Sequence, residues 1–478
     1  MNRPIIRLYG FVALLFALLV AFTSRWTIFD ASSLRENPLN ARELLEQEHI
    51  DRGPIVAANG AVLARSVRGP EGTYERTYPS GSEFANTVGY HYINRGSTGI
   101  ERFRNSALSG QSASNLQAIL NQLQGKEPVG EKVVTTLDPG AQQVANTALA
   151  GHKGAVVALD PRTGAVTVMA SSPSFNLNAA SSSTAFKKVE SESSQAPLIN
   201  RATEDGYAPG STFKLVTATA AIDTGAFTPS STLSGRNGIL VSGKTLDNDE
   251  GESYGQLTLT QALAKSVNTV YAQVAERIGK QTLGRYMERF GFDQEPQLDY
   301  PATEMSPSGE YLGGHLLPPT SPLVDVGRMG IGQDKLEVTP LQMAEVAATV
   351  ANHGTLMVPH MTARIVDSEG RTVEQIAPRV QSVVMKRSTA SAVTSMMEAV
   401  VTEGTGTSAQ IPGVQVAGKT GTAQTQFGDT INNVWFVAFA PASDPRVAIA
   451  VTLQAVPGQG ATYAAPVARE VMEKLLND

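Results

Sequence analysis

The feature that most constrains this chain is an uncharged apolar run near its amino terminus. Residues 8–24 carry no charged side chain, and 14 of these 17 residues are apolar. A helix that crosses a bilayer needs about 20 such residues, so the run lies near the lower limit. Arg3 and Arg7 precede it, and the positive-inside rule places the amino terminus in the cytoplasm. We predict a single-pass plasma-membrane anchor, with the rest of the chain extracytoplasmic.

Two other interpretations of this run are open. A cleaved signal peptide would carry small residues at a short cleavage site, and Ala21-Phe22-Thr23 fits that pattern poorly. A buried core helix would not be expected to begin its uncharged run at residue 8. The remaining chain is mildly acidic, since the whole sequence has 38 basic and 44 acidic residues. This balance, without a basic cluster, argues against nucleic acid as a ligand.

The chain of 478 residues contains no cysteine. A disulfide scaffold, a thiol nucleophile and thiolate-bound zinc or iron–sulfur sites are therefore excluded. A hydroxyl group becomes the leading candidate for any nucleophile. The six histidines are scattered without metal-ligand spacing, and we interpret them as ordinary residues; they stand at positions 49, 91, 152, 315, 353 and 360.

Residues 26–150 form a mixed, turn-rich region without an internal repeat. Two short apolar runs flank Asn59-Gly60, which predicts a β-hairpin. Gly99 belongs to a turn that leads into a helix. Asp138-Pro139 has the residue types of a helix cap and first helical position, which predicts a helix that continues to about residue 150.

The residue pattern changes after residue 150, where longer apolar segments begin. Two apolar segments, 154–159 and 165–170, read as strands joined by a tight turn, and two more strands are expected at 433–440 and 446–453. The Ser-rich stretch 179–195 is predicted to be a mobile surface loop. The middle, about 211–410, alternates helical segments with Gly/Pro loops, and the tail 466–476 is predicted to be an amphipathic helix. This order suggests one sheet, built from both ends of the region, with helices on its faces.

Ser211 and Lys214 form the first candidate pair. Pro209-Gly210 marks a helix start, where backbone N–H groups are free and the helix dipole is positive. The helix that follows is apolar on nearly all faces, which predicts burial, and Gly225 ends it. A lysine in an apolar site beside another cation is driven towards its neutral form and can activate a serine hydroxyl. Ser-x-x-Lys alone is common by chance, and a helix cap with a solvent-reaching lysine is the alternative.

Ser266 and Asn268 lie two residues apart between two helical segments and can point into the same cleft. The serine hydroxyl can relay a proton, and the asparagine amide can hold a substrate amide. Taken alone, Ser-Val-Asn is better explained as a helix cap.

The third element, Lys419-Thr420-Gly421-Thr422, lies in an ambiguous context. Residues 413–420 satisfy G-x-x-x-x-G-K-[ST], a phosphate-binding loop that requires a strand before it and a helix after it. Ile411-Pro412 precedes this segment instead, and residues 425–429 are unsuited to a helix. We therefore reject the phosphate loop.

A strand over 414–424 is the better interpretation of this segment. Because Gly421 has no side chain, another backbone can approach the strand closely at this position. A peptide could then pair along the strand edge. Lys419 and the hydroxyls of Thr420 and Thr422 would meet a carboxylate.

The ordered set Ser-x-x-Lys, Ser-x-Asn and Lys-Thr-Gly is far more specific than its parts. It resembles the penicillin-binding proteins, and the chain is similar to the class B members, monofunctional D,D-transpeptidases, above all the actinobacterial penicillin-binding protein A group. Val267 replaces the Asp of the β-lactamase form of the second motif. The resemblance covers nearly the whole chain and includes Arg52-Gly53-x-Ile55, Asn59-Gly60, Gly99-Ile100-Glu101, residues 158–164, Asn200-Arg201, residues 209–214 and residues 338–342.

The resemblance implies an α+β transpeptidase fold, a mostly antiparallel sheet flanked by helices, over residues 151–478. Residues 26–150 would form a non-catalytic pedestal domain of the dimerisation type, and residues 1–25 the cytoplasmic tail and transmembrane anchor. No metal or organic cofactor is implied. The implied partners are D-Ala–D-Ala stem peptides of peptidoglycan, β-lactams, a glycosyltransferase and other proteins of cell-wall synthesis during growth and division.

The resemblance also implies residue roles. Ser211 attacks the D-Ala–D-Ala bond and becomes acylated, with Lys214 as general base. Ser266 passes the proton to the leaving D-alanine, assisted by Lys419, and Asn268 holds the substrate backbone. The backbone N–H groups of residues 211 and 422 form the oxyanion hole, and an amine from a neighbouring stem peptide resolves the acyl-enzyme. The implied substrate-binding residues are Thr420, Gly421 and Thr422, which bind around the terminal carboxylate.

Alternatives from other classes share parts of this pattern. A D,D-carboxypeptidase or β-lactamase would use the same site with water, but neither needs the long segment before residue 151. A bifunctional glycosyltransferase–transpeptidase would need a longer one with a carboxylate-rich motif. A β-lactam sensor is expected to carry more membrane spans and a cytoplasmic effector. A catalytically inactive scaffold would not be expected to keep all three motifs intact.

Overall fold

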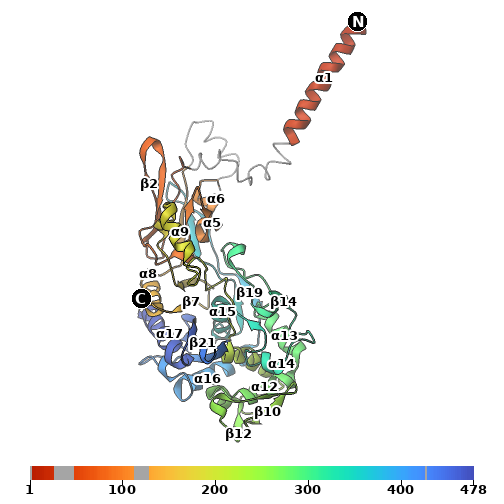
Figure 1. Ribbon diagram of the computed structural model, residues 1–478, viewed down its shortest axis with the longest axis vertical. Helices are drawn as coiled ribbons and strands as arrows, with labels where there is room; N and C mark the ends of the chain where they lie inside the picture. Colours follow the sequence, from red (N-terminus) through yellow and green to blue (C-terminus); the bar gives the residue numbers. More distant parts are fainter. Residues whose placement is uncertain (1–2, 26–47, 112–128, 426–427, 478) are drawn as a thin grey trace.

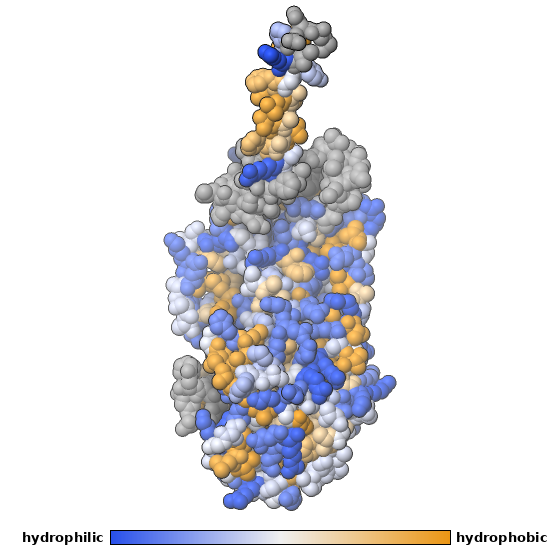
Figure 2. Space-filling view, turned by 90° about the vertical axis from the view of Figure 1, so that its right-hand side faces the viewer, coloured by the Kyte–Doolittle hydropathy of each residue, from blue (hydrophilic) through white to orange (hydrophobic). Residues whose placement is uncertain are grey.

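The computed structural model describes residues 3–25, 48–111, 129–425 and 428–477 (Figure 1). Helix α1 (Arg3–Ser24) contains the predicted apolar run. It is the one helix of the described residues that is long and apolar enough to cross a membrane, over Arg7–Ser24, and none of that span is buried. Figure 2 shows it as an apolar segment, whereas the face of the body mixes polar and apolar residues.

A five-stranded antiparallel sheet forms the centre of the carboxy-terminal part. Its order, β20-β21-β22-β7-β8, joins strands from both ends of this region, as the sequence predicts. In register, Ala158 lies opposite Ile449, and Lys419 opposite Val437. The strands are β7 (Lys153–Leu159), β8 (Val166–Ser172), β20 (Ala417–Thr425), β21 (Gly428–Ala440) and β22 (Val447–Val456).

Alternate residues of this sheet enter two different cores, because successive side chains of a strand point to opposite faces. On β21, Trp435 packs in one core with helix α15 (Pro340–Ala351), all twelve residues of which are buried. Phe436 packs in the other core with α8 (Pro139–Leu149) and α17 (Gly460–Asn477). The predicted tail helix therefore begins six residues earlier than expected.

Helix α8 begins at the expected cap, since the Asp138 carboxylate accepts a hydrogen bond from the N–H of Ala141 at 2.7 Å. Its buried face, which includes Ala141, Ala145 and Leu149, belongs to the core of the catalytic sheet. By packing, α8 therefore contributes to the core of the carboxy-terminal sheet.

The predicted mobile loop at 179–195 is wrong for most of its length. A 3-10 helix, η3 (Leu177–Ser181), is followed by α9 (Ser183–Ser191). The Ser182 hydroxyl caps α9 by accepting from the N–H of Ala185, and Phe186 is buried against Tyr90 with ring centroids 5.6 Å apart. One aromatic anchor and one cap therefore order a segment whose composition resembles a loop.

The amino-terminal module is built on a six-stranded sheet, β18-β17-β6-β1-β2-β3. The predicted hairpin at Asn59-Gly60 joins β1 to β2, with Gly60 at a positive φ of 86°. Two strands of this sheet, β17 and β18, come from the distant segment 362–375. The strands are β1 (Ile55–Val56), β2 (Val62–Arg68), β3 (Tyr74–Thr77), β6 (Lys132–Thr135), β17 (Thr362–Val366) and β18 (Thr372–Gln375); the short helices and hairpin strands are η2 (Pro70–Gly72), α4 (Ala85–Val88), β4 (His91–Tyr92), β5 (Gly96–Ser97), α5 (Gly99–Phe103) and α6 (Asn105–Leu108).

The middle of the chain is helical, as predicted, but it also carries short hairpins that the sequence pattern does not indicate. Its helices are η4 (Gly210–Phe213), α10 (Lys214–Asp223), η5 (Asp249–Gly251), α11 (Leu259–Ala264), α12 (Asn268–Ile278), α13 (Lys280–Arg289), η6 (Ala302–Glu304), α14 (Val326–Met329), α16 (Arg387–Thr402) and η7 (Thr407–Ala409). Its strands are β9 (Thr232–Ser234), β10 (Ile239–Val241), β11 (Lys244–Leu246), β12 (Gln256–Thr258), β13 (Gly309–Leu312), β14 (His315–Leu317), β15 (Leu336–Glu337), β16 (Thr355–Met357) and β19 (Val380–Val383).

Candidate active site

Ser211 lies in the 3-10 turn η4, directly before helix α10. The turn begins at Gly210, whose φ of 53° suits glycine, and a Cβ there would meet the Thr422 carbonyl oxygen at 2.6 Å. The N–H of Gly210 donates to the carbonyl of Gly332 at 2.9 Å. Glycine at this position therefore allows the turn that carries Ser211 to lie directly against β20.

Lys214 is the first residue of α10 and is fully buried. Its Nζ lies 3.0 Å from the Ser211 Oγ, 2.7 Å from the Ser266 carbonyl oxygen and 2.7 Å from the Asn268 Oδ1. The Ser266 Oγ is 3.3 Å away. One amine therefore connects the first two sequence motifs, which the chain separates by 52 residues.

The electrostatics of this amine favour its neutral form. Burial and the neighbouring Lys419 ammonium lower the pKa of Lys214 well below its usual value, and Asp249 opposes them. The neutral form is the one that can take a proton from Ser211.

Ser266 and Asn268 stand at the junction between α11 and α12, as their spacing predicts. Ser266 has a positive φ of 58°, which turns the chain sharply between the two helices. Asn268 opens α12, and its Nδ2 donates to the carbonyl of Asp247 at 3.2 Å. The asparagine amide is therefore fixed at one end by backbone and at the other by Lys214.

The third motif lies on β20, the edge strand of the sheet, and a strand rather than a helix runs through it. Lys419 is fully buried; its Nζ is 2.9 Å from the Ser266 Oγ and 2.9 Å from the Thr420 carbonyl oxygen. Burial lowers the pKa of Lys419 to about 7. Ser266 is thus shared between two lysines.

The lack of a side chain at Gly421 serves a different purpose from the one expected, which was the approach of a substrate backbone. A Cβ there would meet the carbonyl oxygen of Pro209 at 2.7 Å and the Thr212 side chain at 2.8 Å, both beside Ser211. The close backbone approach is therefore made by the protein's own η4 segment. The opposite edge of β20 remains free of any strand partner among the described residues.

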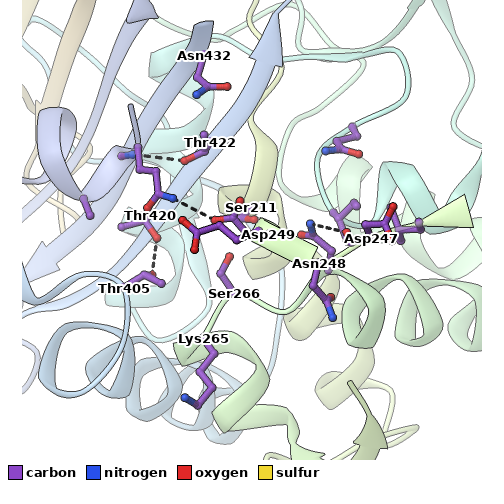
Figure 3. Close-up of a pocket in the computed structure, with 18 of the residues that line it drawn as sticks. Ser211, Asp247, Asn248, Asp249, Lys265, Ser266, Thr405, Thr420, Thr422 and Asn432 are labelled. Atoms are coloured by element: carbon purple, nitrogen blue, oxygen red, sulfur yellow. Dashed lines mark hydrogen bonds between the residues drawn. The ribbon is translucent and has the colours of Figure 1, made fainter. Parts of the chain in front are cut away.

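These residues surround a cavity of about 890 Å³ (Figure 3). Ser211, Ser266, Asn268, Thr420 and Thr422 line it, and Lys214 and Lys419 lie behind the lining. The arrangement suits attack by an activated hydroxyl on a carbonyl group.

Several lining residues carry no motif that the sequence could reveal. Thr405 joins the third motif, with its Oγ1 2.6 Å from the Thr420 Oγ1. Asn432 and Gln459 come from β21 and the loop before α17. The segment 245–250 approaches from β11 and η5. The Gly-Thr-rich composition around Thr405 is the one local signal among them.

Comparison with known proteins accounts for this geometry. Residues 154–473 match the penicillin-binding protein transpeptidase domain family, and residues 52–133 match the penicillin-binding protein A dimerisation domain family. The chain is 33% identical to the peptidoglycan D,D-transpeptidase PbpA of Mycolicibacterium smegmatis, over the whole of both chains. It is 30% identical to the peptidoglycan D,D-transpeptidase MrdA of Acinetobacter baumannii, over 79% of this chain and 62% of that one.

A solved structure shares the architecture as well. The ceftriaxone acyl-enzyme complex of penicillin-binding protein A from Mycobacterium tuberculosis superposes with a TM-score of 0.81 and 31% identity, over 91% of this chain and all of that one. With matched family domains in both modules and full-length relatives, this chain belongs to the class B penicillin-binding proteins and is a peptidoglycan D,D-transpeptidase.

Proposed function

We propose that Ser211 is the nucleophile of this transpeptidase and Lys214 its general base. The observation that carries the proposal is the buried Lys214 amine 3.0 Å from the Ser211 Oγ, held there by the Ser266 and Asn268 oxygens. The neutral amine takes the hydroxyl proton as Ser211 attacks the carbonyl of the penultimate D-alanine of a stem peptide. A base placed in this way contributes about 10²–10⁴-fold to the rate.

The remaining residues complete the acylation step. The C–N bond to the terminal D-alanine breaks, and Ser266, 2.9 Å from the Lys419 amine, passes a proton to the leaving nitrogen. The backbone N–H groups of residues 211 and 422 stabilise the oxyanion; the contact of Gly210 with Thr422 supports their proximity. The terminal carboxylate binds at Thr420, Gly421 and Thr422, with the Lys419 charge beneath, and Asn268 holds the substrate backbone.

The second step joins two stem peptides. An amine from a neighbouring peptide attacks the ester. This step forms the cross-link and frees Ser211. β-Lactams acylate Ser211 in the same way and block the site, as ceftriaxone does in the relative described above. The glycan strands come from a partner glycosyltransferase, which the proposal includes together with other proteins of wall synthesis.

The proposal also includes a membrane location. Helix α1 carries Arg3 and Arg7 at its start, so its amino terminus is cytoplasmic and the catalytic module extracytoplasmic. An uncleaved anchor retains the transpeptidase at the membrane, where its substrates are assembled. Residues 26–150 act as a pedestal between anchor and active site.

The test of the nucleophile is covalent labelling. Fluorescent penicillin is expected to label the purified protein stoichiometrically, and Ser211→Ala is expected to abolish the label without unfolding the chain, since the side chain is only partly buried. Ser66→Ala, which alters a hydroxyl in the amino-terminal module, is the matched control and keeps the label. Labelling that persists in Ser211→Ala would refute the assignment.

A rival with the same residues is a D,D-carboxypeptidase, in which water resolves the acyl-enzyme. The volume of the cavity, about 890 Å³, favours transfer because it has room for a second peptide beside the donor. A stem-peptide donor presented with and without an acceptor amine separates the two reactions through the products formed.

A further inference from the structure

The active-site cavity has two electrical poles. Behind its lining lie the buried amines of Lys214 and Lys419. Its lining also includes three exposed carboxylates, Asp247, Asp249 and Glu250, which lie close together where the chain leaves β11 and enters η5. The donor peptide of the proposed reaction ends in a carboxylate, which matches the cationic pole. The anionic pole has no such role in acylation.

The three carboxylates are not neutralised within the part of the chain that the structure describes. None of the ion pairs found there includes Asp247, Asp249 or Glu250. Two cations also line the cavity, but both have other partners. Arg328 lies 3.5 Å from Asp325 and donates to the Thr245 carbonyl at 3.1 Å, and Lys265 stacks over the Tyr254 ring at 5.7 Å. In Figure 3, the Lys265 side chain extends away from Ser211.

The segment that carries these carboxylates is fixed beside the catalytic residues. Asn268 donates to the Asp247 carbonyl at 3.2 Å, and the N–H of Thr269 donates to the Asn248 Oδ1 at 3.0 Å. Asn248 is buried. Asp249 is close enough to Lys214 to act on its electrostatics, and Figure 3 draws it among the residues that line the cavity with Ser211.

The side-chain hydrogen bond of Asp249 across the cavity comes from a neutral group. The Gln459 Nε2 donates to its Oδ2 at 3.2 Å. The neighbouring Gly458 carbonyl accepts from the Nδ2 of Asn432 at 2.9 Å. Asn432 is 9% exposed and lines the same cavity, and its Oδ1 has no hydrogen-bond partner among the described residues. A buried acceptor without a donor, in the same cavity as a carboxylate without an ion pair, matches a ligand that brings N–H groups.

We propose that Asp249 binds the ammonium group of the acceptor peptide and selects a cationic amine as the second substrate. This inference rests on the proposed function, because it assigns the acceptor half of the same cavity. Asp247 and Glu250 extend the negative field around Asp249, and the Asn432 Oδ1 accepts from an N–H of the acceptor backbone. Asp249 is a specificity residue and not a base.

The transfer step forms one C–N bond and breaks the C–O bond of the acyl-enzyme. The bound ammonium releases one proton to solvent, and the resulting amine nitrogen forms a C–N bond with the carbonyl carbon of the acyl-enzyme. The C–O bond to Ser211 breaks, and the second amine proton returns to the Ser211 Oγ through Lys214. The products are the cross-linked peptide and the free enzyme.

The test compares two acceptors in the Asp249→Asn variant. The change removes the charge and keeps an oxygen that accepts from Gln459, so the connection across the cavity is retained. The readout is the ratio of aminolysis to hydrolysis of a thioester stem-peptide donor. One acceptor is a stem tripeptide with a single primary amine, and the other is hydroxylamine, which is uncharged at neutral pH.

The variant is expected to lose about 2–5-fold in the aminolysis ratio with the cationic tripeptide, the scale of an exposed ion pair. The ratio with hydroxylamine is expected to stay within about twofold, in keeping with the absence of charge pairing. Asp444→Asn, which makes the same change at an exposed carboxylate outside the cavity, leaves both ratios at their wild-type values. An unchanged ratio with the tripeptide, or an equal loss with both acceptors, overturns the inference.

A second measurement needs no variant. In the wild type, the preference for the tripeptide over hydroxylamine is expected to fall as salt is added, because salt screens an exposed ion pair. A preference that does not change with salt also overturns the inference. Failure of the wild type to be acylated would instead refute the proposed function, so the two failures are distinguishable.

Discussion

Oxygen atoms surround the amine of Lys214. Four lie within hydrogen-bond distance, and two of them, the Ser266 carbonyl and the Asn268 Oδ1, can only accept. A neutral amine gives its two N–H groups to these acceptors and turns its lone pair towards a hydroxyl. The geometry therefore accommodates the neutral form that the lowered pKa favours.

Lys214→Arg tests this state, because a guanidinium stays charged at any accessible pH. Acylation by penicillin is expected to slow by about 10²–10⁴-fold, the usual contribution of a general base. In the wild type, acylation falls as the pH drops through the lowered pKa of Lys214, since protonation removes the base. The second-order rate constant, measured against pH, checks both statements.

The control for this variant is Lys188→Arg, which changes an exposed lysine of α9. Its rate constant should follow the wild-type pH profile. An arginine variant that acylates at the wild-type rate would show that another group removes the Ser211 proton.

At the scale of the element, the contact between β20 and η4 holds the motifs together. Gly421 allows this contact, because the Pro209 carbonyl, the Thr212 side chain and the Trp435 Cβ all lie within 3.0 Å of where its Cβ would be. The Trp435 ring N–H also donates to the Ala208 carbonyl at 3.0 Å. The nucleophile and the carboxylate-binding strand are thus aligned by backbone packing.

Gly421→Ala is therefore expected to move β20 away from Ser211. Penicillin acylation should slow by about 10–100-fold, since a displacement near 1 Å costs about that much in a preorganised site. Gly255→Ala provides the control, because a Cβ there meets nothing within 4 Å. Equal rates for both variants, measured on folded protein by circular dichroism, would contradict the role given to this contact.

Local patterns predicted the elements that depend on nearby residues. The strands β7 and β8, the capped helix α8 and the hairpin at Gly60 follow from alternation, capping and turn chemistry. Helix α9 was missed because its order comes from one aromatic contact, Phe186 with Tyr90, made across almost one hundred residues of chain. The motifs Ser211, Ser266 and Lys419 were predictable as a set, but their convergence on two buried amines is visible only in three dimensions.

At the scale of the whole molecule, the two modules share structure that no local pattern could reveal. Strand β17 pairs with β6, so residues after 360 complete the sheet of the amino-terminal module. Arg104 extends the junction, with its Nε 2.9 Å from the Thr362 hydroxyl and its Nη2 3.2 Å from Asp299. Sequence alone assigns each segment to the module around it, whereas long-range pairing assigns β17 to the other.

Within the amino-terminal module, Glu101 lies between Arg52 and Arg76 at 2.8 and 2.6 Å. Burial alone would raise the pKa of Glu101, but the two guanidinium groups lower it to about 2. The charge of this buried carboxylate is therefore kept at any physiological pH. Two residues before it, the N–H of Gly99 donates to Glu304 of the catalytic module at 2.9 Å, which is one of the contacts between the modules.

The membrane anchor is the last feature to test, and it concerns the molecule as a whole. Exposed apolar side chains cover α1, and a soluble protein would have to bury them. The full-length protein is expected to sediment with membranes, to resist extraction by salt and to dissolve in detergent. Its intact mass should include residues 1–24.

The matched variant replaces residues 1–25 with a cleavable signal peptide. The protein should then be exported, recovered in the soluble extracytoplasmic fraction and labelled by penicillin as before, because no residue of the active site lies in α1. A natural protein that is soluble and begins after residue 24 would instead identify α1 as a signal sequence. The cleavage site then decides between the two fates, since the positive residues before the run orient it in both cases and only a cleavage site releases it.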